Sequence, residues 1–433
     1  MISKSIIAND RQARDVAAAI ERIVQAQSSE QILRSVIEGL PHEVIDGVLR
    51  SLAAERSELE ALLGAYSDAK EGNPDRLRER AGNDLGGLLV VARVSRGWSQ
   101  KELARRLFLP EQQVQRYEAE RYRSISLGSL IRVARTLGVR LTAELPTQFQ
   151  EQWLPSYEMS QADAQKVLKH ARVHGWLDKT NQTDESGLSQ LKRTVAEHVS
   201  EHGTPSLLRT GLNVETHAQD WLLLAWKAQV TRRAISDLQR IKTRYNPLDI
   251  SWLKDLVRLS AKSDGPSFVP AFLASHGIIL ICEPQIAGMN VDGAAFLIDD
   301  SPVIGLTLRH DRLDNFWFTL MHELAHVVVH YRTGLASGFF DNVDNPSIDE
   351  IEREANQFAS NLLIPDELWI RSPARIAKSV EPIERLAEQL DISSAIIFGR
   401  IRLERNNYTI FSNKIGQGKV RKLLFREVSE GVA

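Results

Sequence analysis

Residues 314–330 have the sequence DNFWFTLMHELAHVVVH, and this stretch predicts the central helix of the C-terminal half. Apolar side chains lie on nearly every side of the helix that it predicts, so we expect the helix to be buried. His322 and His326 are one turn apart, which lets both imidazoles bind one metal ion. Glu323 lies about 100° further round the helix, where it can reach a water on that metal without being a ligand.

Two histidines do not hold a zinc ion, so the site needs a third protein ligand. The best candidate is Glu352, in a helix predicted over 348–363 after a loop rich in Gly, Asn and Asp. Asn356 follows one turn later and is expected to orient one of the histidines. Glu354 points to another side of that helix and is a weaker alternative, and His330 is expected to pack behind the site rather than to bind the metal.

Three short, β-branched, apolar runs precede this helix pair and predict one small sheet. They are Gly277–Cys282, Ala294–Ile298 and Val303–Leu308. Cys282, the only cysteine, can form no internal disulfide, and its apolar neighbours predict a buried thiol rather than a nucleophile.

Two motifs together resemble the ImmA/IrrE family of metallopeptidases over residues 270–370. They are DNFWFTLMHELAH at 314–326 and EREANQFA at 352–359, the latter followed by LLIP at 362–365. The resemblance implies an α+β, zincin-like (gluzincin-type) domain in which His322, His326 and Glu352 bind the metal. It also implies cleavage of a transcriptional repressor or regulator. We expect one Zn²⁺ per chain, although Mn²⁺ or another divalent ion fits such ligands too.

The chemistry expected of this site is peptide hydrolysis, with Glu323 as the general base that takes a proton from the metal-activated water. An extended substrate could pair with a strand edge such as that of Val303–Leu308. Arg309, His330 and Tyr331 are candidates for a second group that stabilises the transition state.

A basic module lies upstream, where residues 86–145 hold 11 Lys and Arg against 5 Asp and Glu in a chain of net charge −2. A capping box at Ser99 begins a short helix, Phe108 and Leu109 form a turn, and Pro110 begins a second helix. The pattern over 85–141 resembles an Xre/Cro-type helix-turn-helix, with Glu120 where such domains usually have Gly. The expected DNA-contacting residues are Gln100, Gln112, Gln113, Arg116, Arg121 and Arg123, with Arg105 also suited to phosphates.

The whole chain is therefore expected to be multi-domain and mostly α. Its predicted ranges are an N-terminal helical region (1–80), the helix-turn-helix (81–145), a helical connector (146–265) and the peptidase domain (266–433), with a linker within Ser67–Asp84. No apolar run is long enough for a membrane span, so we expect a cytoplasmic protein.

The expected partners are a DNA operator and a protein substrate, and the sequence leaves open whether the chain forms a homodimer. The competing hypothesis is a non-catalytic repressor or antitoxin whose peptidase fold senses a metal or a partner; the N-terminal region faintly resembles HigA-type antitoxins.

Overall fold

The computed structural model describes residues 6–28, 40–82, 84–123, 125–142, 160–178, 183–202, 218–241, 243–298, 300–331 and 348–425. The chain divides into two compact units. The first comprises Met1–Leu33 and Leu52–Gln150, and the second comprises Arg34–Ser51 and Glu151–Ala433. The second unit thus takes in both the expected connector and the expected peptidase domain, and the four predicted ranges stay predictions.

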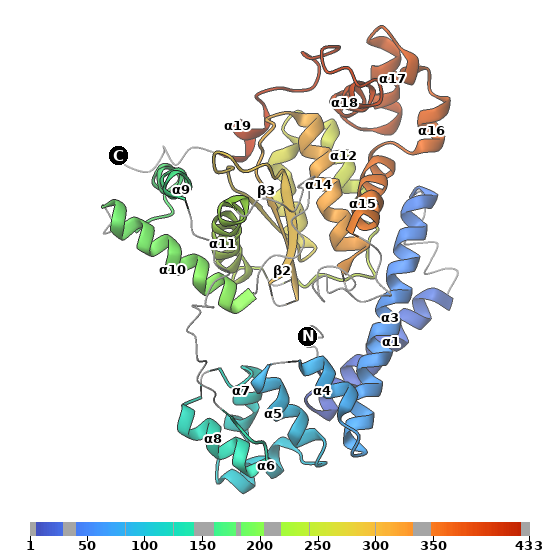
Figure 1. Ribbon diagram of the computed structural model, residues 1–433. Coiled ribbons are helices and arrows are strands. Elements are labelled where there is room, and N and C mark those ends of the chain that lie inside the picture. The colour runs from blue at the N-terminus through green and yellow to red at the C-terminus, as the bar shows by residue number, and fades with distance from the viewer. Residues whose placement is uncertain are drawn as a thin grey trace. The chain divides into compact units, whose positions relative to one another are not determined.

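The described part of the first unit is helical (Figure 1). Its helices are α1 (Asp10–Ser28), the C-terminal part of α3 (His42–Lys70), α4 (Asp75–Ala81), α5 (Leu85–Val94), α6 (Gln100–Leu107), α7 (Glu111–Ala119) and α8 (Leu127–Thr136). The hydroxyl of Ser99 accepts a hydrogen bond of 3.0 Å from the backbone N–H of Glu102, as the capping box predicts. The Glu102 carboxylate, however, pairs with Arg105 and Arg106 instead of turning back to the cap.

The expected linker over Ser67–Asp84 is wrong. Helix α3 continues to Lys70, and α4 occupies much of the remainder. The polar side chains of this stretch face outward, whereas Ala69, Leu77 and Ala81 are buried. Small and sparse apolar residues were enough to anchor these helices, so the composition resembled that of a linker.

The second unit is built round the three-stranded sheet that the sequence predicts. The strands are β1 (Ile279–Cys282), β2 (Gly293–Ile298) and β3 (Ser301–Leu306), in the order β1-β3-β2. Strand β3 is parallel to β1 and antiparallel to β2. The expectation that Val303–Leu308 could offer a free edge is therefore wrong, because β3 is the central strand and β2 lies at an edge.

Helices cover the two faces of this sheet (Figure 1). One face packs on α11 (Ala218–Leu238): a Cβ added at Gly305 would lie 2.7 Å from the ring of Trp226. Because neighbouring residues of a strand point to opposite faces, Leu306 and its cross-strand partner Gly293 face α14 (Leu313–Val328). A core of residues from α9 (Gln161–Val173), α10 (Asp184–His202), α11 and the strands fills the α11 side.

Further helices surround α14 in the second unit. Helix α15 (Ile348–Leu363) packs along it, and the buried Ala355 and Ala359 allow a close approach. Helix α18 (Ser394–Glu404) packs on α14 at Gly399, where an added Cβ would lie 2.7 Å from Asp314. The remaining helices are α9 (Gln161–Val173), α10 (Asp184–His202), α12 (Leu253–Arg258), α13 (Val269–Ser275), α16 (Asp366–Arg371), α17 (Glu381–Leu390) and α19 (Val420–Leu424), with 3₁₀ turns at Leu259–Ala261, Gly265–Phe268 and Pro373–Ile376. Within the described residues, no helix is long and apolar enough to cross a membrane.

Candidate metal centre and nucleic-acid interface

Helix α14 is buried on nearly every side, as its sequence predicts. Its site residues His322, Glu323 and His326 expose only 6%, 3% and 7% of their surfaces. Polar groups removed from water to this extent must be paired inside the protein, because an unpaired buried polar group costs about 1–3 kcal/mol and a charged one costs more.

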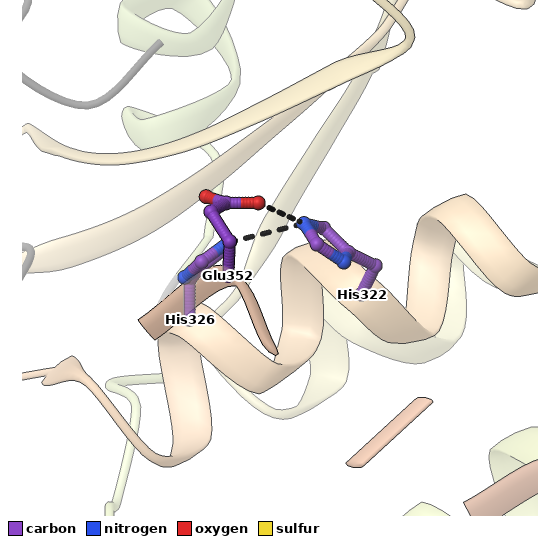
Figure 2. A group of neighbouring side chains, drawn as sticks. All are labelled: His322, His326 and Glu352. Atoms are coloured by element: carbon purple, nitrogen blue, oxygen red, sulfur yellow. Dashed lines mark hydrogen bonds and ion pairs between the residues drawn. The ribbon is translucent and has the colours of Figure 1, made fainter. Parts of the chain in front are cut away.

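The side chains of His322 and His326 converge with Glu352 from α15 (Figure 2). The two Nε2 atoms are 3.2 Å apart, and the Glu352 carboxylate oxygens lie 3.3 Å from Nε2 of His322 and 3.5 Å from Nε2 of His326. Ligands of a tetrahedral zinc ion, each about 2.1 Å from the metal, are separated by about 3.4 Å. One ligand atom from each of the three residues lies within 4.8 Å of the other two, so the residues are close enough together to bind one ion.

Each histidine has a separate partner for its other ring nitrogen. Nδ1 of His322 lies 3.1 Å from Oδ1 of Asn356, and this oxygen can only accept. The neutral His322 ring thus carries its proton on Nδ1, which leaves the Nε2 lone pair for a metal. Nδ1 of His326 lies 3.3 Å from Nδ1 of His330.

The surrounding charges favour one positive charge at this cluster. Burial alone would lower the pKa of His322, but its hydrogen bond to Glu352 and the nearby carboxylates outweigh burial and raise it. Burial, together with the adjacent rings of His322 and His330, holds the pKa of His326 well below its usual value. A proton or a metal ion can supply the positive charge that the carboxylates attract.

Glu323 lies against strand β2 rather than among the three donor atoms. A Cβ added at Gly293 would lie 2.7 Å from Oε1 of Glu323, so only glycine leaves room for the carboxylate there. Burial raises the pKa of Glu323 to about 7, and the charges of Glu352 and Asp292 act in the same direction. A carboxyl group with a pKa near neutrality can both accept and return a proton.

A pocket of about 910 Å³ opens beside these residues. Its wall includes His322, Glu323 and Glu352 together with three residues that the sequence analysis did not single out, Asp292, His310 and Tyr408. These three lie outside the motif helices, in loops whose sequence carries no periodic signal, so only the packing of the second unit brings them to the site.

None of the three groups considered as a second stabiliser is free to act on a substrate in this arrangement. Arg309 forms two hydrogen bonds of 3.0 Å to the Asp292 carboxylate. His330 is buried behind His326, and the Tyr331 hydroxyl donates to a backbone carbonyl at 2.8 Å.

The helix-turn-helix consists of α6 and α7, joined through Phe108, whose φ is 55°. On α7, Gln112 and Arg116 are exposed, and Arg123 is exposed just beyond the helix. Gln115, which is not one of the six expected DNA-contacting residues, is exposed on α7 as well. These side chains form the outward surface of the second helix.

The other three expected DNA-contacting side chains are held inside the module. Gln100 donates to Glu118 at 2.8 Å, and Gln113 donates to the Tyr117 hydroxyl at 2.5 Å. The Arg121 side chain is only 16% exposed and is bound to Asp84 at 3.0 Å. For Arg121 this differs from the expected phosphate contact, because its guanidinium already neutralises a carboxylate of the same unit.

The turn after α7 is altered where Glu120 replaces the usual glycine. Glu120 has φ −89°, and it is Arg121 (φ 51°) and Tyr122 (φ 58°) that adopt the left-handed conformation. Tyr122 is buried, and its ring lies 6.2 Å from that of Tyr117, so packing holds this unusual turn.

Comparison with known families finds one match in each half of the chain. Residues 274–401 match the family described as the IrrE N-terminal-like domain, a peptidase family, and residues 91–143 match a helix-turn-helix family. The chain thus carries a metallopeptidase-like domain with an Xre/Cro-type helix-turn-helix on its N-terminal side. No curated protein and no solved structure matches the chain.

Proposed function

We propose that this chain is a DNA-binding regulator that is also a zinc-dependent, site-specific endopeptidase and that its substrate is a transcriptional regulator. The observation that carries the proposal is the convergence of His322, His326 and Glu352 beside the buried carboxylate of Glu323. The two imidazole Nε2 atoms are 3.2 Å apart, and each has one oxygen of the Glu352 carboxylate at 3.3 or 3.5 Å. Two imidazoles and one carboxylate suit zinc, and manganese is the alternative ion.

A zinc ion held by these residues would activate the attacking water and polarise the scissile carbonyl. Glu323 takes a proton from the water and returns it to the leaving amine, which suits a carboxyl group with a pKa of about 7. Asn356 holds His322 in the tautomer that leaves its Nε2 atom free.

The edge strand β2 is the proposed binding site for an extended substrate segment. Among the described residues β2 pairs with no strand other than β3, so an extended peptide could add to its other side. The backbone N–H of Ala295 on β2 donates a hydrogen bond to Glu323, so a peptide would pair with the remaining backbone groups of this strand. Gly293 at its beginning lies against Glu323, so a peptide paired with β2 passes close to the base. This edge replaces the strand that the sequence suggested.

The metal content of the wild-type protein tests the centre. The chain is purified without chelator or metal-affinity resin and compared with Glu352→Ala and with the control Glu367→Ala, which changes an exposed carboxylate of α16. We expect about one zinc per chain in wild type and control, and little in Glu352→Ala. If wild-type protein takes up no metal even when zinc is added, the peptidase proposal fails.

Catalysis is tested separately by Glu323→Gln. This variant keeps all three metal ligands but cannot accept a proton, so we expect normal zinc content and loss of regulator cleavage in cells. A Glu323→Gln protein that retains the cellular function with zinc bound would favour the non-catalytic sensor instead.

DNA binding is tested on genomic fragments. We expect Gln112→Ala and Arg116→Ala to reduce the preference for the operator, since both side chains can pair with base edges. Arg123→Ala should weaken binding to all DNA sequences. It should also reduce the slope of log affinity against log salt concentration by the amount expected for about one phosphate contact. Arg14→Ala, an exposed arginine of α1, is the control. Equal effects of all four changes would contradict the assignment of this surface.

A further inference from the structure

A chain of polar contacts extends from the candidate metal centre to helix α3. Nδ1 of His326 faces Nδ1 of His330 at 3.3 Å, and Nε2 of His330 lies 3.0 Å from a Glu354 carboxylate oxygen. The other oxygen of Glu354 accepts a short hydrogen bond from Arg50 of α3. His330 is only 4% exposed, so its ring nitrogens cannot be satisfied by bulk water.

The beginning of α3 is packed on the end of α14, and both belong to the second unit. Val44 and Val48 are buried, and the hydroxyl of Ser51 donates to the carbonyl of Val328 at 3.3 Å. A Cβ added at Gly47 would lie 3.6 Å from Val329. Arg50 is therefore presented to Glu354 by a helix segment that is anchored on both sides of it.

The direction of each hydrogen bond in this series of contacts follows from Glu354, at the end away from the metal centre. The ionised Glu354 carboxylate only accepts, so Nε2 of His330 is the donor to it. In the tautomer that donates from Nε2, the His330 ring has a lone pair on Nδ1, and the Nδ1–H group of His326 can donate to it. With its proton on Nδ1, His326 presents the Nε2 lone pair to the site formed with His322.

We propose that His330 and Glu354 are positioning residues that hold His326 in its metal-binding tautomer and that Arg50 of α3 secures this contact chain. The inference rests on the metal centre of the proposed function and adds that the affinity of the centre depends on α3. His322 obtains the same support from Asn356, a neutral side chain on the helix of Glu352, and needs no third element.

The exposures of the three residues predict the order of their effects. His330 is buried and directly contacts His326, one of the expected metal ligands. The side chain of Glu354 is 28% exposed, and that of Arg50 is 64% exposed. Exposed ion pairs contribute little, so loss of the Arg50 contact should matter least. Loss of a partner of a ligating histidine typically weakens metal binding by about ten- to a hundredfold.

The test is zinc affinity, measured on the full chain by competition with a chromophoric chelator. We expect His330→Phe to weaken binding about ten- to a hundredfold, Glu354→Gln up to about tenfold and Arg50→Met a few fold. Arg56→Met is the matched control, because Arg56 is an α3 arginine paired with Glu60 on the surface, and it should leave the affinity unchanged.

His330→Asn separates positioning from mere packing. An asparagine oxygen can occupy the place of Nδ1 and accept from His326, as Asn356 does for His322, so the affinity should stay within a few fold of wild type. Because that amide does not need Glu354, Glu354→Gln should have no further effect in the His330→Asn background. Nitrogen NMR of the zinc-loaded wild type should show His326 protonated on Nδ1.

The outcomes distinguish this inference from the proposed function. Wild-type protein that binds no zinc overturns the metal centre itself. Wild-type protein that binds zinc while His330→Phe and Glu354→Gln bind it equally well overturns only the positioning role. The positioning role would also be overturned if Glu354→Gln weakened zinc binding equally in the wild-type protein and in the His330→Asn variant.

Discussion

The buried ion pair of the helix-turn-helix offers a prediction whose size follows from the structure. Arg93 of α5 and Glu118 of α7 are 3% and 1% exposed and are joined at 2.6 and 2.8 Å. Arg93 also donates to the carbonyls of Ala8 and Trp98, and Gln100 donates to Glu118. Burial alone would lower the pKa of Arg93, but the hydrogen bonds and charge of Glu118 raise it, so the guanidinium stays charged.

Arg93→Met leaves the carboxylate of Glu118 buried with a single donor. Breaking a buried pair in this way costs about 3–5 kcal/mol, which corresponds to about a hundredfold to several thousandfold faster exchange of the amides that the pair protects. Adding Glu118→Leu removes the buried charge, so the cost should fall to about 2 kcal/mol, about 1 for each of the two carbonyls that have lost a donor.

Hydrogen–deuterium exchange of the full-length protein, followed in peptides from α5 and α7, measures these local free energies. Arg105→Met is the matched control, since that arginine belongs to an exposed pair with Glu102, and exchange should not change. The reasoning is refuted if Arg93→Met speeds exchange less than tenfold or if the double variant exchanges as fast as Arg93→Met alone.

Three further predictions concern the second unit. Gly293→Ala places a methyl group 2.7 Å from Oε1 of Glu323, so we expect about a hundredfold slower cleavage at unchanged zinc content; equal rates would place the base elsewhere. Gly305→Ala crowds the Trp226 ring at 2.7 Å and should destabilise the unit by about 1–3 kcal/mol in hydrogen exchange of β3; unchanged exchange would contradict that packing. Burial raises the pKa of Cys282 to about 12, so a thiol reagent at pH 8 should label it only after denaturation. Because the unfolded thiol loses its proton first as the pH rises, stability should also fall above about pH 9.

Local sequence patterns predicted much of the candidate metal centre and of the helices and strands round it. His322 and His326 share a helix face because the period of the helix alone sets their directions. The limits of α15 and of the three strands were close to those predicted, because apolar periodicity and turn residues act over only a few positions. The family match over 274–401 agrees with the resemblance drawn from the two motifs.

Other features depended on which elements meet in space. Nothing near Val303 shows that β3 is the central strand, because strand order is decided by how β1 and β2 pair with it. The sequence predicts a phosphate contact for Arg121, whereas the fold brings Asp84, 37 positions away, to its side chain. Polar residues round α4 resembled a linker because two buried apolar side chains, Leu77 and Ala81, were enough to anchor this short helix.

Side-chain chemistry and helical spacing, both readable from the amino-acid sequence, were enough to predict a His/His/Glu metal site and the two helices that carry it. Tertiary structure alone decided that Gly293 makes room for Glu323 and that Arg50, 304 positions away, contacts Glu354 behind the metal centre. Such contacts come from the packing of elements far apart in the chain, and no local pattern of residue types encodes them.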